Sequence, residues 1–195
     1  MEYMGNNKWW DERFKSHNFK IMLHEKCLEN DLKFFNKNGK ILDIACGDGR
    51  NAIYLAQLGY KVTAIDFSKE ALNRLNYFAN KESLKIETLL SDLSLDNSFD
   101  NLGKFDGAII NHYRLKPQLY DKVMEHLTED GILWINGFVS LPADNPNITE
   151  KDIFNMKDFL SLKKYKLESK KIYKINQNQF IRYIMEKIKK LRYKS

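Results

Sequence analysis

The stretch that decides the fold is Asp43-Ile44-Ala45-Cys46-Gly47-Asp48-Gly49-Arg50-Asn51. It follows a short apolar segment, 40–44, and precedes a segment, 51–58, whose apolar residues recur at helical spacing. Glycines let the backbone turn sharply and let a ligand lie against it without a Cβ in the way. The stretch therefore predicts a strand-to-helix turn that holds a nucleoside-containing cofactor.

Strands and helices alternate on both sides of this turn. Helices are expected over 9–36, 51–58, 69–80 (with Ser68 as N-cap) and 116–127, and strands over 40–44, 61–65, 84–90, 105–110 and 132–138. The alternation predicts an α/β fold, in which a doubly wound, mostly parallel sheet forms the middle layer of a three-layer αβα sandwich.

The C-terminal part has a different pattern. A short helix is expected over 155–162, and the segments 165–174 and 179–189 are expected to form an antiparallel strand pair that closes the sheet. A helix over 179–191 is the alternative for the last segment.

The chain length of 195 residues fits one domain. We expect a helical cap in 1–38, a cofactor-binding core in 39–138, and a substrate-side loop with the C-terminal strands in 139–195. The loop, at 139–153, contains Pro142 and Pro146 and is expected to cover the acceptor. We expect a monomer or a weak dimer.

Composition excludes several classes of protein. Hydrophobic residues make up 43% and charged residues 30%, as in a globular protein, and no apolar run reaches the roughly 20 residues of a membrane span. The N-terminus lacks the apolar core of a secretion signal. Cys27 and Cys46 are the only cysteines and have no metal-site spacing, so we expect a cytoplasmic protein without a metal.

Positive charge is concentrated at the C-terminal end. The net charge is +6, and residues 163–195 hold 12 Lys and Arg against Glu168 and Glu186. Such a segment attracts nucleic acid or anionic lipid, or it simply carries surface lysines. The second interpretation is favoured because no RNA-binding signature is present. Nucleic acid is therefore an alternative partner.

The turn residues alone leave two cofactors open. Gly47-x-Gly49-x-x-Ala52 fits the fingerprint of dinucleotide sites, so an NAD-dependent oxidoreductase is an alternative. Asp43 and Asp48, however, are expected to repel a pyrophosphate and to attract a ligand that carries an ammonium and a sulfonium. Asp66, at the end of the next strand, suits the ribose of either cofactor. The acidic flanks favour S-adenosylmethionine.

An ordered set of motifs carries a family resemblance. Residues 40–51 resemble the first motif of class I S-adenosylmethionine-dependent methyltransferases, D-x-x-x-G-x-G after the first strand. Residues 62–68, 90–93, 105–110 and 127–134 resemble the later motifs in the same order. The similarity covers about residues 9–140 and is nearest to the small tellurite-resistance-type methyltransferases. It implies a Rossmann-like fold and S-adenosylmethionine as the methyl donor.

The resemblance also implies roles for individual residues. Asp43 and the glycine backbone would hold the amino group of the donor, Asp66 its ribose and Asp92 its adenine, while Arg13 would pair with its carboxylate. The complete implied cofactor set is Trp10, Arg13, Asp43, Ala45, Gly47, Gly49, Asp66, Phe67, Asp92, Leu93 and Asn111. Each has a structural alternative: Asp92 fits ordinary turn chemistry, Arg13 a solvated helix face, and Trp10 a packing role.

Residues after the fourth predicted strand are the candidates for the acceptor side. His112 is a candidate proton acceptor near neutral pH, and Tyr113 is a candidate to orient the acceptor. A structural hydrogen bond is the alternative for His112. The segment 111–114 lacks the Asn/Asp-Pro-Pro-Tyr/Phe tetrapeptide of nucleic-acid amino-methyltransferases, so we expect a small-molecule acceptor. An RNA methyltransferase and a non-catalytic cofactor-binding module are the remaining alternatives.

Overall fold

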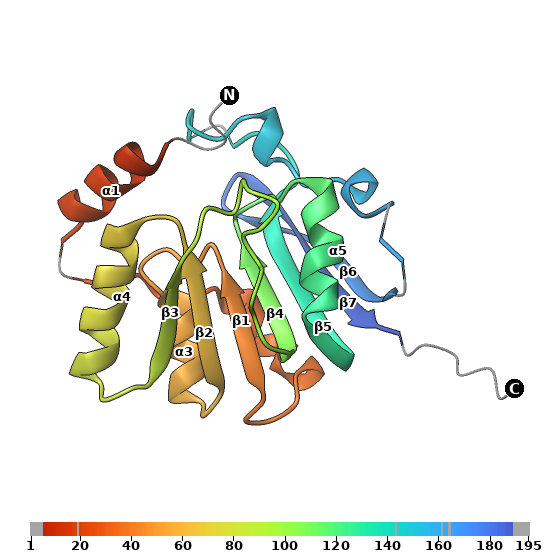
Figure 1. Cartoon of the computed structure of the whole chain (residues 1–195). Coiled ribbons are helices and arrows are strands. Elements are labelled where there is room, and N and C mark those ends of the chain that lie inside the picture. Colours follow the sequence, from red (N-terminus) through yellow and green to blue (C-terminus); the bar gives the residue numbers. More distant parts are fainter. Residues whose placement is uncertain (1–5, 19, 143, 161, 164, 189–195) are drawn as a thin grey trace, which may run out of the picture.

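A computed structural model describes residues 6–18, 20–142, 144–160, 162–163 and 165–188. Within these residues the chain forms a seven-stranded sheet with the order β3-β2-β1-β4-β5-β7-β6 (Figure 1). The strands are β1 (Lys40–Ile44), β2 (Lys61–Asp66), β3 (Ile86–Leu90), β4 (Phe105–Asn111), β5 (Leu127–Phe138), β6 (Tyr165–Ile175) and β7 (Asn178–Lys187).

The first five strands are parallel and the last two are antiparallel to their neighbours. β1 pairs in parallel with both β2 and β4, and β7 lies antiparallel between β5 and β6. The predicted mostly parallel sheet with an antiparallel C-terminal pair is confirmed. The alternative helix over 179–191 is wrong as far as Lys187, and 189–191 lie outside the described residues.

Helices cover both faces of the sheet. They are α1 (Asn7–Ser16), α2 (Lys26–Asp31), α3 (Arg50–Gln57), α4 (Lys69–Lys81) and α5 (Pro117–Glu125), with 3₁₀ turns at Leu32–Phe34, Glu150–Asp152 and Met156–Phe159. Apolar side chains of α2, α3 and α4 form one core with the sheet, and those of α5 form a second core on the opposite face. The three-layer αβα sandwich follows from these two cores, as Figure 1 shows.

The predicted helix over 9–36 is three separate elements in the structure. α1 ends at Ser16, the described residues 17–18 and 20–25 are not helical, and α2 continues into the first 3₁₀ turn. Arg74 explains the break, because its guanidinium donates to the carbonyl oxygens of His17 and Asn18 at 3.3 and 3.1 Å. A tertiary contact therefore overrides the helical pattern in this segment.

Two boundaries differ at the fifth strand. The helix predicted to reach residue 127 ends at Glu125, and β5 begins at Leu127 instead of residue 132. Residues 129–131, between the predicted helix and the predicted strand, form an irregularity inside β5, where the pairing with β4 shifts register and Asp130 has a φ of 64°. The short helix expected over 155–162 is a 3₁₀ turn at Met156–Phe159.

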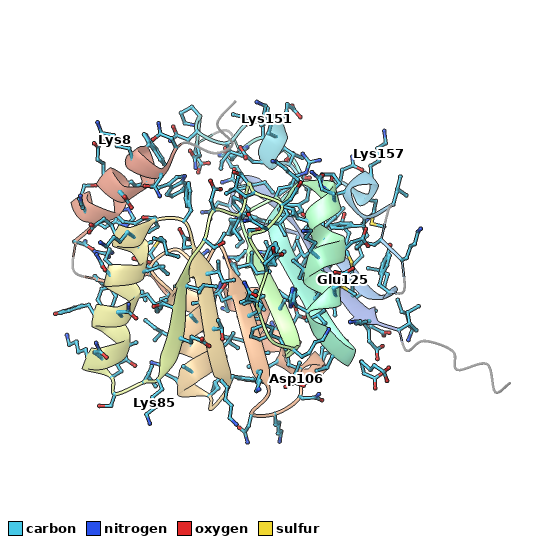
Figure 2. The ribbon with its side chains drawn as sticks, in the orientation of Figure 1. Lys8, Lys85, Asp106, Glu125, Lys151 and Lys157 are labelled. Carbon is cyan, nitrogen blue, oxygen red and sulfur yellow. The ribbon has the colours of Figure 1, made fainter. Side chains whose placement is uncertain are left out.

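The parallel strands end together at one edge of the sheet. Lys8 and Lys151 lie on this side of the molecule, whereas Lys85 and Asp106 lie at the opposite edge (Figure 2). In doubly wound sheets, ligands bind beyond the carboxyl ends of the strands. None of the helices in the described part of the chain is long and apolar enough to cross a membrane.

Candidate active site

The turn after β1 adopts a backbone that most residues avoid. Ala45, Gly47 and Gly49 all have left-handed φ angles, of 56°, 57° and 87°. The turn is fixed to its surroundings because Cys46 N–H donates to the carbonyl of Ile65 at 3.0 Å, and Gly49 N–H donates to that of Cys46 at 3.1 Å. This geometry directs the chain from β1 into α3 and exposes the backbone at Ala45 and Gly47 to a cavity.

Glycine is present at positions 47 and 49 of the turn for two different physical reasons. A Cβ on Gly49 would lie 2.1 Å from Cδ1 of Leu75, so the position has no room for a side chain. A Cβ on Gly47 would meet only the ring of Phe14, at 3.4 Å. Gly47 therefore faces the cavity, and Gly49 allows α3 to pack against α4.

A cavity of about 340 Å³ lies beyond the ends of β1, β2 and β4. It is closed by four segments that follow strands and by α1. Its wall consists of Asn6, Asn7, Trp10, Phe14, Ala45, Gly47, Asp66, Phe67, Asp92, Leu93, Ser94, Asn111, His112 and Tyr113. Aromatic and apolar groups with a few convergent polar groups are typical of a small-ligand site.

Asp66 is the most buried acid in the cavity wall, with 5% of its surface exposed. Its two oxygens accept hydrogen bonds from the backbone N–H groups of Gly47 at 2.8 Å and Ser68 at 2.9 Å. Burial raises the pKa of Asp66, and these backbone donors oppose the rise. The N–H of Phe67 is a third backbone donor to this carboxylate. A carboxylate offers about four lone-pair sites, so Asp66 can hold the turn and still accept from a ligand.

Helix α1 closes the cavity from above. The side-chain amide of Asn7 donates to the carbonyl of Phe67, and the carboxylate of Asp11 accepts from Oγ of Ser68 at 2.5 Å. Trp10 stacks on Phe14 with 5.8 Å between ring centroids, and both rings line the cavity. These contacts attach α1 to the end of β2 and the start of α4.

Three of the predicted cofactor residues are not part of the cavity wall: Arg13, Asp43 and Gly49. The guanidinium of Arg13 lies over the rings of Trp9 and Trp10, at 5.3 and 5.7 Å from their centroids. Gly49 is directed at Leu75.

Asp43 lies beneath the turn and is 1% exposed. Burial and the nearby Asp66 raise its pKa to about 8, against the opposing effects of Arg50 and a hydrogen bond from the N–H of Ala52. Its Oδ2 has no hydrogen-bond partner among the described residues. Asp43 therefore supports the start of α3 from below, and the carboxyl is protonated over much of the neutral range.

The negative charge of Asp48, the second acid of the turn, is balanced by a positive charge. Asp48 is 4% exposed and forms an ion pair with Arg74 at 3.1 Å. Asp48 is therefore not a free negative charge beside the cavity, because Arg74 pairs with it. Burial raises the pKa of Asp43, which weakens its expected repulsion of a pyrophosphate.

The segment after β4 places its side chains against the N-terminal part of the chain. His112 has a φ of 57°, and its N–H donates to the carbonyl of Asn136 at 2.7 Å. Its Nε2 lies 3.2 Å from Oε2 of Glu25, while Asn111 accepts from the side-chain amide of Asn136 at 2.9 Å. Asn111 and His112 therefore have fixed positions at the cavity wall.

Tyr113 has a pKa above its ordinary value because of burial and the negative charges of Asp92 and Asp66. Its hydroxyl stays protonated at neutral pH. The next residue, Arg114, forms an ion pair with Asp158 and donates to the carbonyl of Lys151 at 3.0 Å. This pair ties the segment after β4 to the 3₁₀ turns that follow β5.

The sequence did not indicate Asn6, Asn7, Phe14 and Ser94 as cavity residues, nor Glu25 as a partner of His112. A signal existed for Asn6, which is an N-cap residue and accepts from Trp9 N–H at 2.8 Å. Glu25 gave no signal, because its contact with His112 joins residues 87 positions apart and depends on the tertiary fold.

Solved structures of other proteins share this fold. TehB from Haemophilus influenzae superposes with a TM-score of 0.68 at 21% identity, covering 92% of this chain and 67% of that one. A coclaurine N-methyltransferase bound to N-methylheliamine and SAH superposes with a TM-score of 0.65 at 13% identity, covering 83% and 72%. The fold is that of the Rossmann-like class I S-adenosylmethionine-dependent methyltransferases.

The family follows from the sequence match. A family model described as "Tellurite resistance protein TehB" matches residues 10–132, and the chain belongs to this family. A curated relative from Haemophilus influenzae (strain 10810), named "Probable S-adenosyl-L-methionine-dependent methyltransferase TehB", is 34% identical over 96 residues. That match covers 47% of this chain and 33% of the relative, so the chain spans about a third of the length of the first curated relatives it matches.

Proposed function

We propose that the chain transfers a methyl group from S-adenosylmethionine to a small-molecule acceptor. The observation that carries the proposal is the cavity at the ends of β1, β2 and β4, where Asp66 and Asp92 are the acids of the wall and aromatic groups form much of the rest. Family membership supports methyl transfer in place of the alternative NAD-dependent oxidation.

The wall fits the parts of the donor. Asp66 would accept from the ribose, because it lines the cavity and its carboxylate keeps acceptor capacity beyond its three backbone donors. Phe67 and Leu93 would lie against the adenine, and Leu93 N–H would donate to its ring. Asp92 is exposed, with one oxygen accepting from Ser94 N–H at 2.8 Å, and would accept from the adenine amine.

The amino-acid end of the donor would lie along the turn. Ala45 and Gly47 expose their backbone to the cavity, and Asn111 stands opposite them. Trp10 would cover the donor, and Arg13 would pair with its carboxylate after leaving the Trp9 and Trp10 rings. We propose an indirect role for Asp43, which holds the N–H of Ala52 beneath the turn.

The donor supplies an electrophilic methyl group on a sulfonium, so the chain needs little covalent chemistry. Its residues have to align the acceptor with that methyl group, which is worth up to about 7–11 kcal/mol in favourable cases. Asn111, His112 and Tyr113 line the cavity side by side and are proposed for this task. Because its hydroxyl stays protonated, Tyr113 would orient the acceptor as a hydrogen-bond donor.

Calorimetry with S-adenosylhomocysteine and with NADH tests the cofactor. We expect binding of the first and none of the second. Asp66→Ala should weaken the binding of S-adenosylhomocysteine by about tenfold or more, because a hydrogen bond to a charged group is worth about 1.5–3 kcal/mol. Asp106→Ala, at the opposite edge of the sheet (Figure 2), is the matched control and should bind like the wild type. Binding of NADH alone would overturn the proposal.

A panel of thiols, phenols, amines and oxyanions, incubated with donor labelled in the methyl group, tests the acceptor. Small-molecule turnover is expected, and a protein that binds the donor but labels nothing is a non-catalytic binding module. The RNA alternative predicts binding to tRNA that weakens steeply with salt. The described lysines of β6 have another explanation than RNA binding. β6 is the outer strand of the sheet, and lysine on an outer strand prevents edge-to-edge association.

A further inference from the structure

A buried acid next to the candidate proton acceptor has no assigned role. Glu25 precedes α2, is 7% exposed, and does not line the cavity. Its Oε2 lies 3.2 Å from Nε2 of His112 and 3.3 Å from Nη2 of Arg50. Its backbone N–H donates to the side chain of Asn51 at 2.9 Å, so the position of the acid is fixed from α3.

We propose that Glu25 is a positioning residue that makes His112 a general base, and that the acceptor is consequently a small molecule with a hydroxyl or thiol proton to lose. The inference rests on the proposed methyl transfer and adds the substrate class. It depends on the contact between Glu25 and His112, on the His112 backbone, and on the place of His112 in the cavity wall.

The contact selects one form of the imidazole. Burial opposes ionisation of Glu25, yet its pKa is lowered, because His112, Arg50 and Asn111 stabilise the carboxylate. An ionised carboxylate only accepts hydrogen bonds, so Nε2 of neutral His112 has to carry the proton. The free lone pair is then on Nδ1, which has no hydrogen-bond partner among the described residues.

The backbone of His112 is held in a conformation that is costly for a residue other than glycine. Its φ of 57° lies in the left-handed region, and its N–H bond to Asn136 at 2.7 Å keeps it there. Such residues persist where the surrounding structure fixes them, and they cluster at functional sites. In this conformation His112 contacts Glu25 through Nε2 and also lines the cavity.

The surroundings of His112 make the acid necessary for proton transfer. The rings of Phe138 and Phe180 lie 5.2 and 5.5 Å from the imidazole, measured between ring centroids. An imidazolium formed against two aromatic rings is poorly solvated without a compensating charge. Glu25 supplies that charge, and Arg50 on the same oxygen is the other charged group described in contact with it.

In the proposed step, the O–H or S–H proton of the acceptor moves to Nδ1 of His112, and the freed electron pair forms the bond to the methyl carbon. The carbon–sulfur bond of the donor breaks, and its electron pair stays on sulfur. The products are the methylated acceptor, S-adenosylhomocysteine and a protonated His112 paired with Glu25. A nucleophile that has no proton to lose, such as a halide or an oxyanion, gains nothing from this arrangement.

Nitrogen-15 NMR of the imidazole side chains tests the arrangement without any turnover, using the full chain with His112→Gln to assign the signals. We expect neutral His112 to carry its proton on Nε2 alone. A proton on Nδ1 would overturn the proposal. Glu29→Ala is the matched control, because Glu29 contacts His24 at 2.7 Å away from the cavity and its loss should leave the His112 signals unchanged.

Kinetics separate positioning from a merely structural contact. Glu25→Gln should lower kcat on thiols or phenols by about tenfold or more, and His112→Ala by about 10²–10⁴-fold, with KM of the donor nearly unchanged. An equal loss of kcat in these variants with iodide as the acceptor would refute the assigned acceptor class. Turnover of iodide and oxyanions alone would refute it as well. Failure of the wild type to bind S-adenosylhomocysteine would instead refute the methyltransferase proposal, and the NMR result would still decide the role of Glu25.

Discussion

Replacement of Gly49 by alanine is a direct test of why the turn contains two glycines. The residue has a φ of 87°, and a new Cβ would lie 2.1 Å from Cδ1 and 2.9 Å from Cγ of Leu75. The left-handed backbone costs about 1–2 kcal/mol for a residue with a Cβ. Forcing Leu75 aside adds about 1–3 kcal/mol. Gly49→Ala should therefore lower the free energy of unfolding by about 2–5 kcal/mol.

Urea denaturation of the full chain measures this loss, and Gly103→Ala is the matched control. No atom lies within 4 Å of the Cβ position at Gly103, so alanine there should stay within about 1 kcal/mol of the wild type. Leu75→Ala in the Gly49→Ala background should recover part of the steric loss, giving a coupling of about 0.5–3 kcal/mol. A Gly49→Ala protein within about 0.5 kcal/mol of the wild type would refute the packing argument.

Three further predictions concern Trp10 of α1, the buried acid beneath the turn and the ion pair between β7 and α2. Trp10→Ala should weaken the binding of S-adenosylhomocysteine by about tenfold in calorimetry, because the indole ring would shield apolar surface of the ligand from water. Trp9 lies outside the cavity wall, so Trp9→Ala should leave the binding unchanged. The raised pKa of Asp43, about 8 against 3.8, means that the native state holds this proton more tightly than the unfolded chain, so stability is lost as pH rises through that window. Asp43→Asn should remove up to about 1.4 kcal/mol per pH unit of that loss in urea titrations. Arg182→Met should cost about 3 kcal/mol in the same assay, because it leaves buried Asp31 without its ion-pair partner at 3.0 Å; a double variant that also removes the acid should cost less.

The core of the fold could be predicted because each strand is short, apolar and bounded by turn residues. The segments 40–44 and 61–65 were placed to within one residue, and Ser68 caps α4 as expected, accepting from Ala71 N–H at 3.1 Å. The break after α1 could not be predicted, because it depends on a contact with Arg74 from a distant helix. Local patterns report local preferences, and tertiary contacts overrule them at such points.

The cavity wall was predictable where it follows strand ends. Residues after parallel strands meet at one edge of the sheet, which brings Asp66, Asp92 and Asn111 together from separate segments. Residues contributed by the N-terminal segment were harder to predict, because nothing local says which face of α1 turns inward. Phe14 faces the cavity and Arg13, its neighbour, does not.

The proposed preference for a sulfonium donor over a dinucleotide rests on a different physical reason from the one that the sequence indicated. Repulsion of a pyrophosphate by two aspartates is a weak reason, since Asp48 is paired with Arg74 and burial raises the pKa of Asp43 to about 8. A pyrophosphate needs the free N–H groups at a helix N-terminus. In this chain Asp43 accepts the N–H of Ala52 from below, in the first turn of α3. One N–H group of this helix N-terminus is therefore already engaged by a protein group, and the proposed ligand would contact the backbone of the turn, Asp66 and the aromatic wall.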